Sequence, residues 1–230
     1  LTAARQVWVG FVFDRAILDA LPRADRRVEF IRESLVGLEA QLREMAERAG
    51  VPGVTLLVRH GTSADELPRL AQSLGVQAVY CNHDDEPYAL ARDAAVRGTL
   101  AAAGIALHTS KDHVIFERSE VLTQSGRVYG VFTPYKNAWL KKLDGFYLKA
   151  YPVLRHAAAL AVPPASVAAG VPTLASLGFE TTNLASLKMP AGPAGAQSMF
   201  ADYLQRIDDY EYQMRFVMNV LGMNAAAGAR

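Results

Sequence analysis

The densest group of chemically active side chains is the run NHDDE at residues 82–86, which contains one imidazole and three carboxylates. Carboxylates bind Mg²⁺, and a histidine beside a carboxylate can act in general acid–base chemistry. Adjacent residues of an extended chain point to opposite sides, however, so these groups cannot all face one ligand. Acidic groups here also suit the N-terminus of a following helix. We therefore expect capping with one or two ligand contacts, and no metal site.

A second polar turn, RHGTS at residues 59–63, places a glycine and two hydroxyls ahead of a helical pattern. Such a turn could hold an anion. The favoured interpretation is an ordinary strand-to-helix turn, in which Ser63 and Glu66 form a capping box. Neither GxGxxG nor GxxxxGK[ST] occurs, which disfavours dinucleotide dehydrogenases and P-loop enzymes. No GxSxG elbow occurs, Cys81 lies in a predicted buried strand, and the 5 histidines lack ligand spacing, so we assign no catalytic residue.

Short apolar runs separated by helical patterns position these turns. The runs lie at residues 7–13, 54–59, 78–82 and 105–109, and the helical patterns at 26–48, 63–74 and 87–100. This alternation predicts an α/β fold, a doubly wound, Rossmann-like parallel sheet with helices on both faces. Ligands of such sheets bind outside the carboxyl ends of the strands. The residues to inspect are therefore Asp14 and residues 59–61, 82–86 and 109–111.

The composition bears on the partners and the cell compartment that suit this protein. The net charge of +1 gives no global attraction to nucleic acid, and the 1 cysteine suits a reducing, cytoplasmic compartment. No apolar run approaches the roughly 20 residues of a membrane span, and the first residues lack the layout of a signal peptide. Since the sequence enters an apolar run almost at once without a methionine, we expect a missing beginning.

The last third of the chain has a different texture. Residues 151–195 form a Pro/Ala-rich linker, and a helical pattern returns at 196–221 with Phe200, Leu204, Ile207 and Tyr210 on one face.

Several segments, taken in order, resemble one known family. FVFDRAIL, RRVEFIRESL, LLVRHG, VYCNHDDEPYALARD and KDHVIFERSEVLTQSGRVYGVFTPYKNAW are similar to the N-terminal α/β domain of DNA photolyases and cryptochromes. This resemblance covers roughly residues 5–150, and LGFETTNL and RIDDY extend it to about residue 210.

The resemblance implies that a longer parent protein repairs cyclobutane pyrimidine dimers in DNA with light-excited FAD, which a helical C-terminal domain binds. The matching N-terminal domain houses or borders an antenna chromophore. On this basis we divide the chain into an antenna domain at 1–150, a linker at 151–195 and the start of the FAD-binding domain at 196–230. The family's first strand and its FAD site are both expected to be absent, so we predict no repair by this chain alone.

Antenna-binding residues of the family can be assigned in this chain only at positions where the sequence matches the family. Members with a deazaflavin or flavin antenna match this sequence at Asp14, Arg27, Asp84 and Glu86. Members with a folate antenna carry an Asn-Glu pair where this chain has Tyr88 and Ala89, so folate is the less expected chromophore.

The stretch VFTPYKNAW completes the predictions. Thr133 and Pro134 suit a helix start, and Phe132 and Trp139 are expected to anchor that helix on the sheet. Lys136 and the nearby Lys141 and Lys142 form either a solvated basic face or a contact with DNA or the absent domain. An unpaired sheet edge and an uncovered domain face would favour self-association.

Two functions other than the antenna part of a photolyase remain as alternatives. One is a non-catalytic module that binds a flavin or nucleotide, and the other is a fragment of a cryptochrome photoreceptor.

Overall fold

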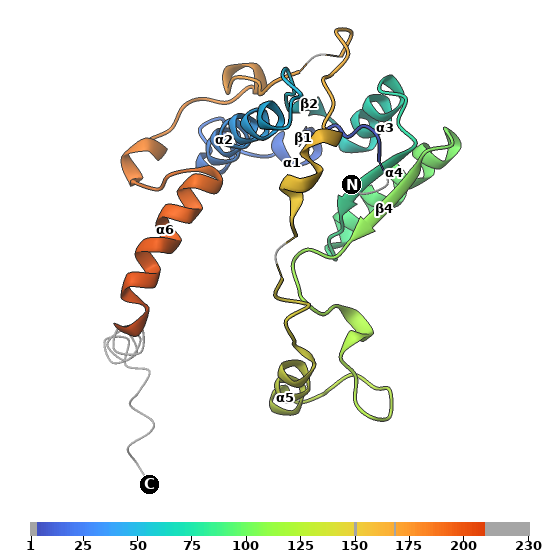
Figure 1. The fold of residues 1–230 in the computed structure, drawn as a ribbon, viewed down its shortest axis with the longest axis vertical. Coiled ribbons are helices and arrows are strands. Elements are labelled where there is room, and N and C mark those ends of the chain that lie inside the picture. Colours follow the sequence, from blue (N-terminus) through green and yellow to red (C-terminus); the bar gives the residue numbers. More distant parts are fainter. Residues whose placement is uncertain (1–3, 150, 168, 210–230) are drawn as a thin grey trace. The chain divides into compact units, whose positions relative to one another are not determined.

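The computed structural model describes residues 4–149, 151–167 and 169–209 (Figure 1). The chain divides into two compact units. The first contains Leu1–Leu21 and Leu42–Gly170, and the second contains Pro22–Gln41 and Val171–Arg230. No helix among the described residues is both long and apolar enough to cross a membrane.

The four strands of the first unit are all paired in parallel, which confirms the α/β class. They are β1 (Gly10–Asp14), β2 (Leu57–Gly61), β3 (Ala78–Asn82) and β4 (Ala106–Ser110). Strand β1 pairs with β2, and β3 pairs with β4, so the described strands form two small sheets where we expected one continuous sheet. The two sheets remain separate because no described strand lies between β1 and β3.

Helices follow the strands much as the periodicity predicts. The α-helices are α1 (Arg15–Leu18), α2 (Arg26–Arg48), α3 (Ser63–Ser73), α4 (Pro87–Ala102), α5 (Phe132–Lys142) and α6 (Gly192–Arg206). Short 3₁₀ helices are η1 (Arg118–Glu120), η2 (Val153–Ala159), η3 (Ala175–Leu177), η4 (Leu184–Leu187) and η5 (Ile207–Asp209).

Helix α3 packs against both small sheets. Leu70 joins Leu57 of β2 in one buried cluster. Ala71 of the same helix joins Val96 and Leu100 of α4 in another, against which Val79 of β3 and Leu107 of β4 also pack. Helices α3 and α4 therefore form one layer that holds the two sheets together.

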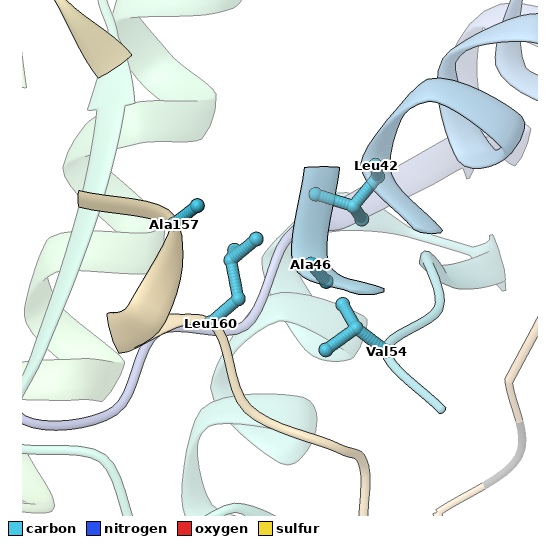
Figure 2. Packing of buried hydrophobic residues seen from close by; sticks show 5 residues of the cluster. All are labelled: Leu42, Ala46, Val54, Ala157 and Leu160. Atoms are coloured by element: carbon cyan, nitrogen blue, oxygen red, sulfur yellow. The ribbon is translucent and has the colours of Figure 1, made fainter. Parts of the chain in front are cut away.

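A further cluster of the first unit joins the end of α2 to residues far along the chain. Figure 2 shows Leu42 and Ala46 of α2 facing Val54, Ala157 and Leu160. Ala157 and Leu160 belong to the Pro/Ala-rich segment, which therefore contributes side chains to this core. The division into antenna domain, linker and FAD-domain start stays a prediction.

Some local expectations are wrong. Ser63 is the first residue of α3 and not its cap, because Thr62 holds the N-cap position. Helix α5 likewise begins at Phe132, before Thr133 and Pro134. Cys81 is exposed, and β4 is the one described strand that pairs with β3.

Helices α5 and α6 both carry exposed apolar side chains. Phe132 is 73% exposed, so it does not anchor α5, whereas Trp139 packs against Phe116 with ring centroids 5.5 Å apart. Of the four residues that the helical pattern places on one face, Phe200, Leu204 and Ile207 are exposed, and Tyr210 lies outside the described residues.

Candidate functional site

Asp14 lies at the carboxyl end of β1, where its side chain is buried. It caps α1 by accepting a hydrogen bond from the Ala16 N–H at 3.0 Å. Burial alone would raise the pKa of this carboxyl. Hydrogen bonds from Ser63, Ala16 and Tyr88 outweigh burial and hold the pKa of Asp14 below its usual value of 3.8. The site therefore contains a buried, ionised hydrogen-bond acceptor.

Tyr88 is the residue that sequence reasoning missed. Its hydroxyl donates to Asp14 Oδ2 at 3.1 Å and so joins the start of α4 to the end of β1. Burial and the Asp14 carboxylate raise the pKa of Tyr88 above its usual value of 10.0, so the hydroxyl keeps its proton. No local pattern signals this contact, because the two residues are 74 positions apart.

Asp84 and Glu86 follow β3 and lead into α4. Asp84 Oδ1 accepts from the Glu86 N–H at 3.0 Å, and this bond is the main reason that the pKa of Asp84 lies below its usual value. Glu86 is the N-cap residue of α4, but its side chain makes no capping bond. Its exposed carboxylate has no hydrogen-bond donor among the described residues and is available to a ligand.

Charged pairs tie the loop after β4 to the end of β3. His83 Nε2 lies 2.7 Å from Glu117 Oε2, and Arg118 Nη2 donates to Asp85 Oδ1 at 3.0 Å. A small cavity of about 170 Å³ opens between these segments, with Asp84 in its wall. Of the acidic run at residues 82–86, His83 and Asp85 thus have partners in this loop.

Arg27 lies in the second unit, near the start of α2. Its guanidinium pairs with Asp25, with Nη2 2.6 Å from Oδ2, and this pair lowers the pKa of Asp25 from 3.8 to about 2. An open cavity of about 520 Å³ is lined by Asp25, Arg26, Arg27, Thr182 and neighbouring residues. Its volume falls within the range of small-molecule sites.

The structure thus brings three of the four predicted antenna residues into one unit. Asp14, Asp84 and Glu86 lie at strand ends of the first unit, and the Tyr88 hydroxyl connects Asp14 to the helix that Glu86 begins. Arg27 belongs to the second unit. Among the described residues, no group of three or more His, Cys, Asp or Glu side chains is arranged to hold a metal ion.

Comparison with known proteins identifies the family. A family model described as DNA photolyase matches residues 1–166. A deoxyribodipyrimidine photo-lyase of Halobacterium salinarum is 32% identical over 206 residues, which cover 89% of this chain and 40% of the relative. A protein of the same name from a Synechococcus species is 29% identical over 90% of this chain and 41% of the relative. Mouse cryptochrome-1 is 25% identical over 78% of this chain and 29% of the relative.

Solved structures agree at the level of the fold. A Synechocystis cryptochrome superposes with a TM-score of 0.69 at 16% identity, over 90% of this chain and 43% of the other. A class III photolyase of Agrobacterium tumefaciens gives a TM-score of 0.61 at 22% identity, over 89% and 39%. The chain spans about two fifths of the length of the photo-lyase relatives. With the family model matching more than half of its residues, the chain belongs to the DNA photolyase family.

Proposed function

We propose that this chain is the light-harvesting part of a photolyase-type protein and binds a flavin or deazaflavin antenna at the strand ends of its first unit. The observation that carries this proposal is the buried, ionised Asp14, which Tyr88 joins to the helix that begins beside Glu86. The strand ends of a parallel sheet are where α/β proteins bind their ligands.

The chemistry of the site suits such a chromophore. Flavins and deazaflavins carry a ring imide N–H and a polyhydroxylated side chain, all of which are hydrogen-bond donors. Asp14, Asp84 and Glu86 supply carboxylate acceptors, and bonds to charged acceptors are stronger than those between neutral groups. Of these carboxylates, that of Glu86 is exposed and has no other donor among the described residues.

The family resemblance also predicts Arg27, which lies in the second unit, as an antenna residue. Its side chain is 70% exposed and lines the open cavity of the second unit, and its guanidinium makes three hydrogen bonds to the Asp25 carboxylate. A planar guanidinium with free donors can bond to a ring carbonyl or stack on an aromatic ring.

An absorption titration between about 300 and 500 nm with riboflavin, FMN and an 8-hydroxy-deazaflavin tests this function. We expect saturable binding with a shifted chromophore band. Glu86→Gln and Arg27→Gln should each weaken binding roughly tenfold or more, the loss expected for one charge-assisted hydrogen bond. Glu47→Gln, at an exposed position of α2, is the matched control and should leave the affinity unchanged. Equal weakening by all three variants, or no binding of any chromophore, would contradict the proposal.

Repair of pyrimidine dimers is proposed for a photolyase-length parent that also carries the FAD domain, and not for residues 1–230 alone. We expect no light-dependent reversal of thymine dimers when an oligonucleotide is illuminated with this chain and free FAD. Reversal above the level with FAD alone would overturn this part. A cryptochrome-type parent is the alternative, since cryptochrome-1 proteins are among the relatives. We also propose a cytoplasmic location, which the 1 cysteine of the sequence suits.

A further inference from the structure

The outer edge of β4, on the side away from β3, carries backbone groups without partners among the described residues. The Ala106 N–H donates to the Gln77 carbonyl at 3.1 Å, which fixes the direction of the ladder between the two strands. Because alternate residues of a parallel strand direct both backbone groups to the same neighbour, the even-numbered residues of β4 bond to β3. The backbone groups of Leu107 and Thr109 therefore point outward, where β4 has no described neighbouring strand.

The loop that follows β4 is tied to the other side of the strand. His83 Nε2 lies 2.7 Å from Glu117 Oε2, and Arg118 Nη2 donates to Asp85 Oδ1 at 3.0 Å. His83 and Asp85 follow directly after β3, so both contacts draw the loop toward the strand that β4 already has as a neighbour. This loop therefore leaves the outer edge of β4 open.

Strand β4 also lacks the features by which proteins usually protect an open edge. Its sequence, ALHTS, contains no charged residue and no proline. All 5 of its residues pair with β3 in an unbroken register, so the strand has no bulge. Since charges, prolines and bulges are what hinder pairing with another chain, the edge of β4 is suited to accept a further strand.

A second copy of β4 fits this edge in a register that uses the whole strand. When two copies pair antiparallel over all 5 residues, Leu107 lies opposite Thr109 of the second copy, and His108 lies opposite His108 of the second copy. The two Leu107–Thr109 pairs are the ones whose backbone groups point outward, and each pair exchanges two hydrogen bonds. The twofold axis of such a pair passes beside His108.

The side chains agree with this register. Tyr80 and His108 stack on the exposed side of β3 and β4, with ring centroids 4.8 Å apart and ring planes at 22°. Residues of a non-hydrogen-bonded antiparallel pair have Cα atoms only about 4.5 Å apart, so two His108 rings would continue this stack across the axis. On the side that the helices cover, Leu107 meets Thr109. No pair in this register places two Lys, Arg, Asp or Glu side chains opposite each other.

We propose that the outer edge of β4 is a homodimer interface, at which two copies of this chain pair their β4 strands antiparallel about a twofold axis beside His108. The two-stranded sheets of β3 and β4 in the two copies then form one four-stranded sheet. An unrelated strand could bond to the same backbone groups, but only a second copy gives the self-complementary register and the continued stack of rings. The contact uses none of the predicted antenna residues and does not depend on chromophore binding.

Disulfide cross-linking tests the register directly. In a Cys81→Ser background, His108→Cys places two thiols opposite each other at a Cα separation of about 4.5 Å, which a disulfide can span. Ser110→Cys is the matched control, at an exposed residue of the same strand. Position 110 lies opposite Ala106 of the second copy, so its two thiols are four residues apart along the strand, about 14 Å. Under mild oxidation we expect a covalent dimer of the His108 variant and at least about tenfold less of the Ser110 variant.

Amide hydrogen exchange at rising protein concentration tests the backbone pairing. The amides of Leu107 and Thr109 should exchange at least about tenfold more slowly at high concentration. The amides of the even-numbered residues of β4 already donate to β3 and should change little. Thr109→Pro removes an outward donor at an edge position where proline is tolerated, and it should weaken dimerisation at least about tenfold in sedimentation velocity. Unchanged exchange at Val79 of β3 would confirm that this variant is folded.

Two results would overturn the proposal. Equal cross-linking at positions 108 and 110 would mean that copies of the chain meet through another surface. Exchange at Leu107 and Thr109 that does not depend on protein concentration would mean that a second copy does not cover this edge.

Discussion

Two buried carboxylates, Asp14 and Asp25, are kept ionised by different kinds of neighbour. Asp14 relies on neutral donors, namely a hydroxyl of Ser63, a backbone N–H and the Tyr88 phenol. Asp25 relies on the Arg27 guanidinium, which also satisfies both of its oxygens. Neutral donors reach Asp14 from three elements, whereas Asp25 and Arg27 are sequence neighbours. The Asp14 site is therefore the one whose ionisation depends on the tertiary fold.

Tyr88→Phe tests that dependence. Loss of the phenol donor should raise the pKa of Asp14 and lower the free energy of unfolding at pH 7 by about 1 kcal/mol. The pKa of folded Asp14 lies below the unfolded value, so its stabilising effect is present above about pH 3.8 and is lost as pH falls through the folded pKa. Carbon-detected NMR titration and urea unfolding measure the two quantities. Tyr80→Phe, at a 74% exposed tyrosine, is the control and should change neither.

Arg27→Gln should move the pKa of Asp25 from about 2 toward 3.8. In the unchanged protein, Asp25 stabilises the fold above about pH 3.8, and this contribution disappears as pH falls toward about 2. As the pH is lowered through that window, the free energy of unfolding of the variant should therefore fall less steeply than that of the unchanged protein. Urea unfolding at a series of pH values measures this difference. Arg26→Gln removes a cation whose partner is the neutral Asn183, so an equal effect there would argue against the ion pair.

At the scale of elements, α5 of the first unit packs on an aromatic cluster around Phe116. Phe116 is 5% exposed and packs edge-on against Trp139 of α5 and against Tyr147. Lys142 lies 4.9 Å above the same ring and donates to the Glu120 carbonyl. No residue of α5 itself is buried. The position of this helix therefore depends on a residue outside it.

Phe116→Ala should release α5 without unfolding the strands. Removing the ring leaves Trp139 without its main contact, so we expect red-shifted tryptophan emission and faster amide exchange in α5. Exchange in β1 to β4 should stay slow. Phe132→Ala deletes a ring of the same size that is 73% exposed and should change neither signal. Global unfolding of the Phe116 variant would show that the cluster supports the whole unit.

The sequence predicts elements better than their surroundings. Strand β3 was expected at residues 78–82 and lies there, and α2 begins and ends where its apolar stripe does. Burial of Cys81 was inferred from its apolar strand, but burial requires neighbours on both edges, which a local pattern does not specify. The Tyr88 contact was missed for the same reason. The candidate acidic residues were found because they follow strands directly.

At the scale of the whole molecule, exposed apolar side chains concentrate on the stretch from residue 128 to residue 154. They include Val131, Phe132, Phe146, Leu148, Tyr151 and Leu154, each at least 65% exposed. Monomeric proteins rarely expose so many large apolar groups together. The photo-lyase relatives are more than twice as long, so additional chain could cover this stretch in them.

This exposed stretch should make the chain self-associate. We expect sedimentation velocity to show reversible association that grows with protein concentration and diminishes in the double variant Phe146→Asp and Leu154→Asp. The control is Ile17→Asp, at a 49% exposed residue of α1, which should associate as the unchanged chain does. Purely monomeric behaviour at high concentration would contradict the prediction.

The open edges of β1 and β3 have a consequence for the lifetime of the chain in a cell. A ligand that binds only the folded state, present at one hundred times its dissociation constant, adds about 2.7 kcal/mol to the free energy of unfolding. Such a gain reduces the unfolded fraction, on which proteases act, by about a hundredfold. The steady-state abundance of this protein would then rise in the presence of any ligand that binds the folded chain across these edges.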